Sequence, residues 1–183
     1  MEECFSLMHE LHLQAYHIIA ESPAEVVISY ENTSTTLTSP SNYCRFDLRH
    51  CNDYAAICRE AGKTYLTHMC GRLSGFAEDL SHSRQDGFID IAPAPTGDVR
   101  MGEAKRTWAR DRVLGGGIDA TASTSLSPEG MRRYVWDVLD EVQEEAGSLR
   151  GFVLGTGDAL PKGAPLPTLR AISRAAREYR AFD

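Results

Sequence analysis

The chain has 183 residues, of which 42% are hydrophobic and 25% are charged, a composition typical of one globular domain. Its formal charge of −7 argues against a protein that binds nucleic acid or an anionic membrane, because such proteins need basic patches to neutralise phosphates. No apolar run approaches the roughly 20 residues of a membrane span. Glu2 and Glu3 stand where a signal peptide would carry positive charge, so we expect a cytoplasmic protein.

The five cysteines form no C-x-x-C pair. In a reducing compartment such residues are most simply free thiols. Cys51 and Cys58 are spaced so that they would share one face of a helix. We therefore expect structural thiols rather than a second metal site.

Helical and strand patterns alternate in the first half of the chain. Apolar residues recur at a helical period over residues 3–21, where His9 and His17 belong to another stripe that we expect to face solvent. Val26–Tyr30 is predicted to be a buried strand, and the polar run from its end to Pro40 is a candidate substrate loop. The further predicted segments of this half are a helix over 54–61, a strand over 64–68, a helix over 73–80 and a strand over 87–91.

The second half contains the clearest helix. Ser127 is a suitable N-cap, Pro128 suits the first turn, and an apolar stripe continues until Gly147 ends the helix. The other predicted segments are a helix near Val99 capped by Asp98, a strand over 112–114 followed by Gly115-Gly116-Gly117-Ile118-Asp119, a strand over 151–154 followed by Gly155-Thr156-Gly157-Asp158, and a last helix from Leu169 to Tyr179.

Five alternations of strand and helix predict an α/β fold with a parallel sheet and crossover helices. Because such helices cover both faces of many parallel sheets, we expect strands that are apolar throughout. Two architectures satisfy this pattern. A doubly wound five-stranded sheet fits the length, whereas a closed (β/α)₈ barrel typically needs ~250 residues.

The pattern His68-Met69-Cys70-Gly71 is the strongest chemical signal. Residues two apart on a strand point the same way, so an imidazole and a thiol would leave the end of this strand side by side. Both groups are zinc ligands, and parallel α/β folds place their chemistry at the carboxyl ends of strands. An isolated His-x-Cys is nevertheless more often a buried imidazole beside a small apolar thiol.

Three motifs in order along the chain carry a family resemblance. They are Thr67-His68-Met69-Cys70-Gly71, Gly116-Gly117-Ile118-Asp119, and Phe152-Val153-Leu154-Gly155-Thr156-Gly157-Asp158-Ala159-Leu160-Pro161 followed by Leu169-Arg170-Ala171-Ile172. Together they resemble the uroporphyrinogen decarboxylase superfamily, and within it the cobalamin-dependent methyltransferase branch. The resemblance implies a partial (β/α)₈ barrel in which residues 1–183, as a single domain, supply the last five βα units. Such a sheet would expose two edges, so we expect a homo-oligomer or a partner that covers them.

The resemblance also implies a metal site and a reaction. In the methyltransferase branch His68 and Cys70 correspond to two zinc ligands, and the third ligand position falls on Asp158, where the family has a cysteine. Zn²⁺ accepts nitrogen, sulfur and oxygen donors. The implied reaction is methyl transfer between cobalamin on a separate corrinoid protein and a thiol or a methylated small molecule.

Three further residues are candidates for the site. Glu31 and Asn32 close the first strand and should face the same edge as His68, Glu31 as a catalytic group and Asn32 as a cofactor-binding one. Asp119 follows a glycine-rich strand end that lets a ligand approach the backbone, and is a second catalytic candidate. Two other functions stay open at this point: decarboxylation of a uroporphyrinogen-like substrate, and a non-catalytic partial barrel that acts as an interaction module.

Overall fold

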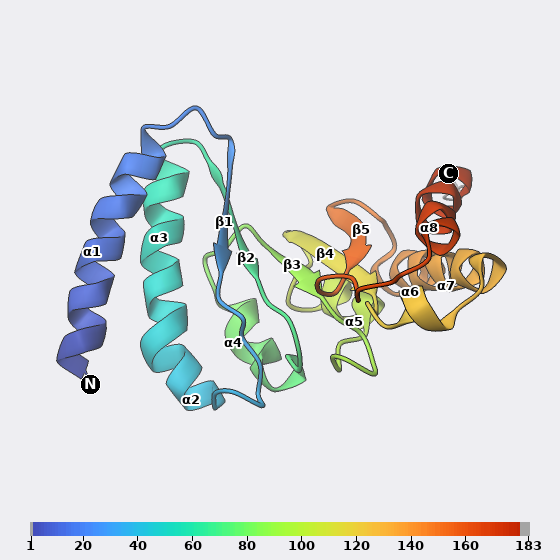
Figure 1. Ribbon diagram of the computed structural model, residues 1–183. Coiled ribbons are helices and arrows are strands. Elements are labelled where there is room, and N and C mark those ends of the chain that lie inside the picture. Colours follow the sequence, from blue (N-terminus) through green and yellow to red (C-terminus); the bar gives the residue numbers. More distant parts are fainter. Residues whose placement is uncertain (1, 180–183) are drawn as a thin grey trace.

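The computed structural model describes residues 2–179, whose strands form one parallel sheet flanked by helices (Figure 1). The strands are β1 (Val26–Tyr30), β2 (Thr64–His68), β3 (Gly87–Ile91), β4 (Val113–Ile118) and β5 (Phe152–Thr156). The helices are α1 (Glu2–Ala20), α2 (Pro40–Asn42), α3 (Arg49–Glu60), α4 (Ala77–Ser81), α5 (Met101–Arg106), α6 (Ala122–Ser125), α7 (Pro128–Ala146) and α8 (Leu166–Glu178). A π-helical turn (Tyr43–Leu48) precedes α3, and a 3₁₀ turn (Ser74–Phe76) precedes α4.

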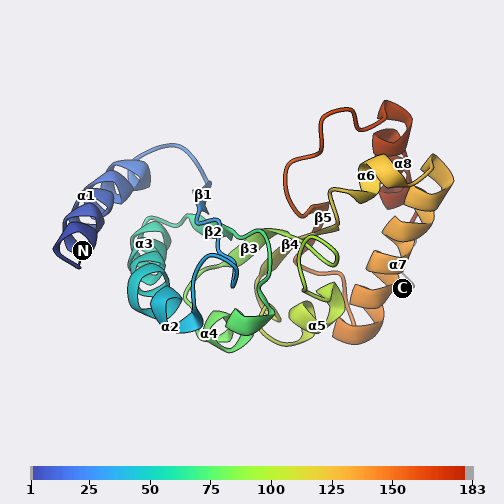
Figure 2. The same ribbon diagram turned by 60° about the horizontal axis from the view of Figure 1, so that its bottom comes forward.

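The order of the strands is that of consecutive units of a barrel. Each strand pairs with the next in the chain, in the order β1-β2-β3-β4-β5, and every pairing is parallel. In Figure 2 the helices α3, α4, α5 and α7 form an arc along one side of the sheet. A doubly wound sheet reverses its strand order and carries helices on both faces. The sheet is therefore wound as part of a (β/α)₈ barrel.

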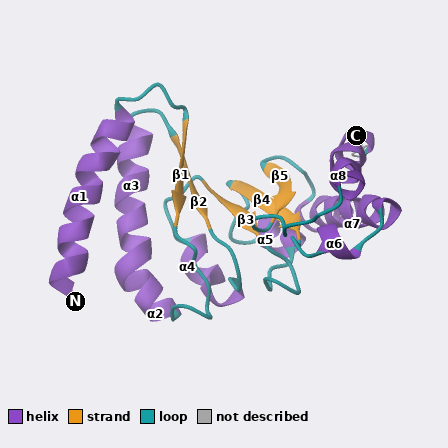
Figure 3. Cartoon of the chain, in the orientation of Figure 1, coloured by secondary structure: helices purple, strands orange, loops and turns teal. Residues whose placement is uncertain are grey.

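Within residues 2–179, no layer of helices covers the other face of the sheet, and this corrects the expectation of strands buried on both faces. Along β1 the side chains alternate: Val27 is buried against α3, whereas Val26, Ile28 and Tyr30 are 49%, 41% and 69% exposed. In a closed barrel such inward-facing side chains fill the interior. Figure 3 shows β1 and β5 as the two outer strands of the sheet.

The apolar core lies between the sheet and the arc of helices. Its largest cluster joins β3 and β4 to α4, α5 and α7, and includes the fully buried Phe88 and Leu114. Helix α7 forms as its sequence predicts: the Ser127 side chain accepts a hydrogen bond from the Gly130 amide, and Gly147 ends the helix with a φ of 74°.

The boundaries of two elements, β4 and α3, differ from those predicted from the sequence. Strand β4 continues through the glycine run to Ile118 instead of ending at Leu114. The glycines allow this because a Cβ on Gly116 would lie 2.2 Å from the carbonyl oxygen of Ile91 on the neighbouring strand. Helix α3 begins at Arg49, earlier than predicted, because it continues directly from the π-helical turn.

Two sequence-based expectations concern the whole chain. Within residues 2–179, no helix combines the length and apolarity that crossing a membrane requires. All five cysteines are free thiols, and Cys51 and Cys58 are buried together on α3, as their spacing predicts.

Candidate functional site

His68 ends β2 with a buried imidazole that is already oriented. Its Nδ1 lies 2.7 Å from Oδ2 of Asp90, and the ring of Tyr30 on β1 packs against it with the ring centroids 5.0 Å apart. When Nδ1–H donates to a carboxylate, the lone pair of the ring is on Nε2. No residue within 2–179 hydrogen-bonds to that Nε2, so it is available as a ligand atom.

Asp90 reaches His68 because β3 contains a β-bulge. Phe88 and Ile91 pair with Leu114 and Gly116, so three steps along β3 match two along β4. Asp90 takes a left-handed conformation, with a φ of 63°, and a bulge of this kind re-aims the side chain it carries. We did not single out Asp90 from the sequence. The signal was available, since Asp90 is a charged residue inside an otherwise apolar strand.

Cys70 lies just beyond β2, next to Asn32 from the loop after β1. The Cys70 thiol is 3.7 Å from Oδ1 of Asn32, within reach of a weak S–H hydrogen bond. The two loops can approach closely because Gly71 has a φ of 99° and its missing Cβ would lie 2.8 Å from the Ser34 hydroxyl. That hydroxyl accepts a hydrogen bond from the Arg72 amide. The structure thus brings Asn32 and Cys70 together.

Asn32 and Asp90 share a backbone property. Within residues 2–179 they are the only non-glycine residues with positive φ, at 45° and 63°. Such conformations cost free energy and concentrate at functional sites. One contacts Cys70 and the other contacts His68. The strained backbone therefore supports the His-x-Cys pair from both neighbouring strands.

Asp158 approaches Cys70 from the far end of the sheet. The loop after β5 crosses above the end of β3, where a Cβ on Gly157 would lie 2.4 Å from Cα of Ala92. Burial raises the pKa of the Cys70 thiol, and the nearby carboxylates of Asp158 and then Asp90 raise it further. Without a cation in this acidic environment, Cys70 is therefore a protonated thiol.

The donor chemistry of His68, Cys70 and Asp158 fits zinc, which takes nitrogen, sulfur and oxygen ligands. A carboxylate that holds the second nitrogen of the imidazole is also common behind zinc-bound histidines, and Asp90 is so placed. In this structure the three side chains do not lie close enough together to hold a metal ion, and within residues 2–179 no other set of three His, Cys, Asp or Glu side chains does so. Cys70 is partly exposed and Asp158 exposed, so both side chains have room to rotate.

Asp119 is buried, at 2% exposure, and fully engaged by hydrogen bonds. Its carboxylate accepts hydrogen bonds from the Thr96 amide at 2.9 Å, from the Thr121 amide at 2.8 Å and from the Thr121 hydroxyl. Burial raises the pKa of Asp119, but the hydrogen bonds from Thr121 and Thr96 outweigh burial and bring it below the usual value. Asp119 thus joins the end of β4 to the loop after β3, and its catalytic role stays a prediction.

The Glu31 amide donates a hydrogen bond to the carbonyl oxygen of His68 at 3.3 Å, but the Glu31 side chain turns away from the His68 imidazole. Its carboxylate accepts a hydrogen bond from the Ser29 hydroxyl, and both residues line a cavity between β1, α1 and α3. Successive side chains of a strand point to opposite faces, so Ser29 and Glu31 point to the face opposite that of Tyr30. The ring of Tyr30 packs on His68. The expectation that the side chains of Glu31 and His68 share one edge is therefore corrected, and a catalytic role for Glu31 stays untested.

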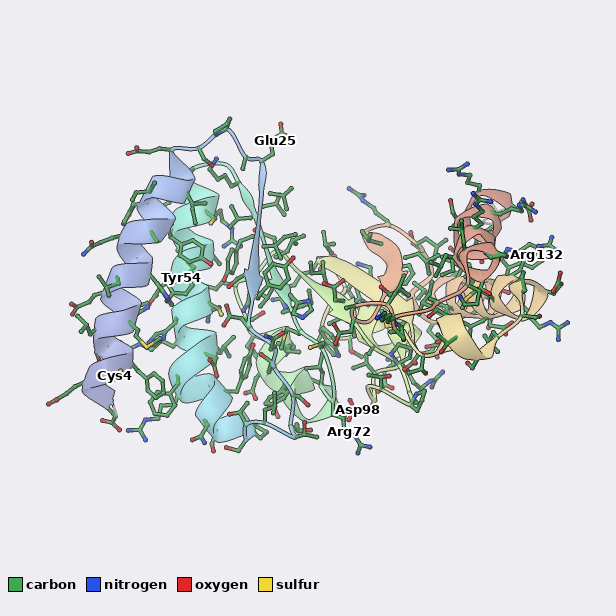
Figure 4. All side chains as sticks on the ribbon, in the orientation of Figure 1. Cys4, Glu25, Tyr54, Arg72, Asp98 and Arg132 are labelled. Carbon is green, nitrogen blue, oxygen red and sulfur yellow. The ribbon has the colours of Figure 1, made fainter. Side chains whose placement is uncertain are left out.

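Asp98 also differs from its predicted position. Helix α5 begins at Met101 and has Arg100 as its N-cap residue. The Asp98 carboxylate instead accepts hydrogen bonds from the Leu73 amide at 2.7 Å and from the Ser74 amide at 3.1 Å, and so caps the turn after β2. Figure 4 shows Asp98 next to Arg72 at this end of the molecule.

One comparison with known proteins identifies a family, and another identifies a shared fold. The sequence model of a family described as uroporphyrinogen decarboxylase (URO-D) matches residues 1–179. Among solved structures, a methyltransferase from Methanosarcina mazei superposes with a TM-score of 0.71 at 17% identity, over 91% of this chain and 47% of that chain. At this identity the likeness shows a shared fold, and the chain spans about half the length of that structure. The comparison with curated proteins returned no match.

Proposed function

The chain belongs to the uroporphyrinogen decarboxylase family, and we propose that its role there is zinc-dependent methyl transfer between a corrinoid protein and a thiol or methylated small molecule. One observation carries this proposal: the two strained non-glycine residues, Asn32 and Asp90, each hold one member of the His-x-Cys pair. The name of the Methanosarcina mazei structure supports the same branch of the family.

Each residue of the site has a distinct role in this proposal. His68 through Nε2, Cys70 and Asp158 would hold the zinc ion. Asp90 fixes the tautomer and orientation of His68, and so acts as a positioning residue. Asn32 contacts the Cys70 thiol and lies where a substrate would reach it.

The acidic surroundings suit a bound cation. When bound, zinc supplies the positive charge that keeps a thiol ionised at neutral pH and thus nucleophilic. Because only one of the three ligands is a cysteine, less of that charge is neutralised than in a site with more thiolates. The site is less suited to a carboxylated substrate, as decarboxylation would require. The charged groups near Cys70 are the carboxylates Asp158 and Asp90, which would repel such a substrate.

The two outer strands of the sheet are places where a partner chain could bind. Within residues 2–179, β1 and β5 each pair with a single neighbouring strand, which leaves two edges able to pair further. We propose that a homo-oligomer or a second protein covers them, and that the corrinoid protein reaches the carboxyl edge of the sheet. The free thiols suit a reducing compartment such as the cytoplasm.

The first experiment is the zinc content of freshly purified protein, by elemental analysis, with its mass in solution determined on the same sample. We expect about one zinc per chain, lost in His68→Ala and in Cys70→Ser. Matched controls are His17→Ala and Cys4→Ser, which remove an exposed imidazole and an exposed thiol from α1 and should leave zinc content unchanged. Asp90→Asn should weaken zinc binding without abolishing it.

The second experiment tests the reaction on the zinc-loaded chain. Methylcobalamin and a simple thiol such as 2-mercaptoethanol are mixed with protein, and demethylation is followed by its absorbance change. Zinc-dependent demethylation that disappears in Cys70→Ser supports methyl transfer. A folded chain without zinc contradicts the proposal, and favours decarboxylation if it releases carbon dioxide from uroporphyrinogen, or an interaction module if it does not.

A further inference from the structure

The cavity between α1, α3 and β1, which Ser29 and Glu31 line, has a volume of about 660 Å³. Its volume is in the range of small-molecule sites. Tyr54, which lines it, projects from α3 toward α1 in Figure 4. His68, Cys70 and Asp158 are not among its lining residues, so it is distinct from the proposed zinc site.

Aromatic rings form much of the cavity wall. Tyr16 and Tyr54 stack with centroids 4.2 Å apart, and Phe5 and Phe46 pack at 5.0 Å. Ring faces attract cations as well as apolar groups.

Two carboxylates face the same cavity without a cationic partner. Glu31 accepts a hydrogen bond from Ser29, and within residues 2–179 Asp47 forms neither a side-chain hydrogen bond nor an ion pair. Burial raises the pKa of Asp47, and the charge of Glu31 raises it further, so the two carboxylates repel each other. The lining contains no lysine or arginine. The cavity lining therefore carries two carboxylates and neither a lysine nor an arginine to pair with them.

The histidines of the cavity do not pair with these two carboxylates. His9 is engaged with Asp53 and Tyr54, both at 3.1 Å, and Nδ1 of His12 lies 3.2 Å from the Tyr54 hydroxyl. The ring of His50 stacks on His9 with centroids 3.9 Å apart, and burial, followed by the charge of His9, lowers the pKa of His50. Within residues 2–179, neither Glu31 nor Asp47 therefore forms an ion pair with a histidine.

Behind the cavity lining is a buried hydroxyl, that of Tyr43, which has no hydrogen-bond partner within residues 2–179. Tyr43 is 1% exposed. The charged neighbours of its hydroxyl are Cys51, Asp47 and Glu31, all of which line the cavity. A buried hydroxyl without a partner is costly, which makes this group a candidate for contact with a ligand.

We propose that this cavity binds a protonated organic amine that carries an apolar or aromatic substituent. The three N–H groups of the ammonium donate to the carboxylates of Glu31 and Asp47 and to the hydroxyl oxygen of Tyr43. The substituent lies against the rings of Tyr16, Tyr54 and Phe46. An amine satisfies all three features at once: the carboxylates without a cationic partner, the open hydroxyl and the aromatic wall.

The test is isothermal titration of the full chain at neutral pH with 2-phenylethylamine, compared with 2-phenylethanol. The alcohol has the same aromatic group and no charge. We expect the amine to bind at least tenfold more tightly than the alcohol. Tetramethylammonium, which carries the charge but no N–H donor, should also bind more weakly than the amine.

Variants identify the binding site. Asp47→Asn should weaken amine binding at least tenfold, and Tyr43→Phe, which keeps the ring and removes the hydroxyl, should weaken it several-fold. Glu60→Gln removes an exposed carboxylate from the end of α3, the helix that follows the π-helical turn carrying Asp47 and Tyr43, and should change nothing. Circular dichroism of each variant verifies that it is folded.

Three results would overturn the proposal. They are equal affinity for amine and alcohol, no amine binding by the folded chain, and unchanged affinity in both Asp47→Asn and Tyr43→Phe. Because amine binding and zinc binding use different side chains, loss of zinc in His68→Ala should leave amine affinity unchanged, and the two proposals can fail separately.

Discussion

Helices α1 and α7 each have 19 residues, yet they are held in the molecule differently. Helix α7 packs against α5, α8 and β4. It buries Met131, Val135, Val138, Leu139 and Val142. Helix α1 packs against α3, buries none of its residues, and leaves large apolar side chains exposed, Leu7, Met8, Leu11 and Ile18. The two helices thus have the same length, and the helix with more neighbouring elements buries more of its apolar side chains.

The largest expected effect contrasts one leucine from each helix. Leu139→Ala in α7 removes a side chain that is 6% exposed, and should lower the free energy of unfolding by about 3 kcal/mol. Leu11→Ala in α1 removes one that is 55% exposed, and should cost less than about 0.5 kcal/mol. Urea denaturation followed by circular dichroism measures both. Equal losses would mean that α1 is buried in solution, for instance by a second chain.

A smaller effect is expected from Asp119→Asn, at the α7 end of the sheet. An amide cannot accept all three hydrogen bonds from Thr96 and Thr121, so we expect a loss of about 2 kcal/mol at pH 7. The pKa of Asp119 lies below its usual value in the folded state, so its stabilisation is present above the unfolded pKa of about 3.9 and lost as pH falls through the folded pKa.

The difference between wild type and Asp119→Asn should therefore disappear in acid, as measured by denaturation at several pH values. Asp111→Asn, which removes an exposed carboxylate, serves as the control and should have little effect at any pH. A loss from Asp119→Asn that persists at low pH would show that the substitution acts through packing.

The smallest effect, and one of opposite sign, is expected from Asp47→Asn beside α1. Burial, followed by the charge of Glu31, raises the pKa of Asp47 in the folded chain, so its ionised form destabilises the fold at neutral pH. Removing the charge should stabilise the amine-free chain by up to about 0.5 kcal/mol at pH 7. The gain should vanish as pH falls below the unfolded pKa of about 3.9, where Asp47 is protonated in both states. Destabilisation at pH 7 would indicate an interaction that Asp47 makes with another molecule.

The sequence predicted the alternation of elements well, because helix caps and apolar periods are local. Ser127 and Gly147 delimit α7 as expected. The extent of β4 was wrong, because the glycine run is explained only by the neighbouring bulge, which a single segment does not reveal. The expectation of strands covered on both faces was wrong for a similar reason, since which side the helices take depends on the whole sheet.

From the sequence, only the pairing of His68 with Cys70 in the candidate site could be predicted. His68 and Cys70 were found because they are two residues apart on one strand. The contact of Asp90 with His68 depends on a left-handed residue within β3, and the approach of Asp158 to Cys70 depends on a loop that crosses the end of the sheet. The side chain of Glu31 faces away from His68 because alternation along β1 gives the face toward His68 to Tyr30.

The strand order has a consequence for how such a protein can change during evolution. Since each strand pairs with the strand that follows it in the chain, most contacts join neighbouring βα units, as in repeat proteins. Whole units can then be gained or lost at either end without breaking a pairing in the middle. A sheet wound in this order is modular, and its central units, which carry Asp90 and Asp119, are those that any such rearrangement would preserve.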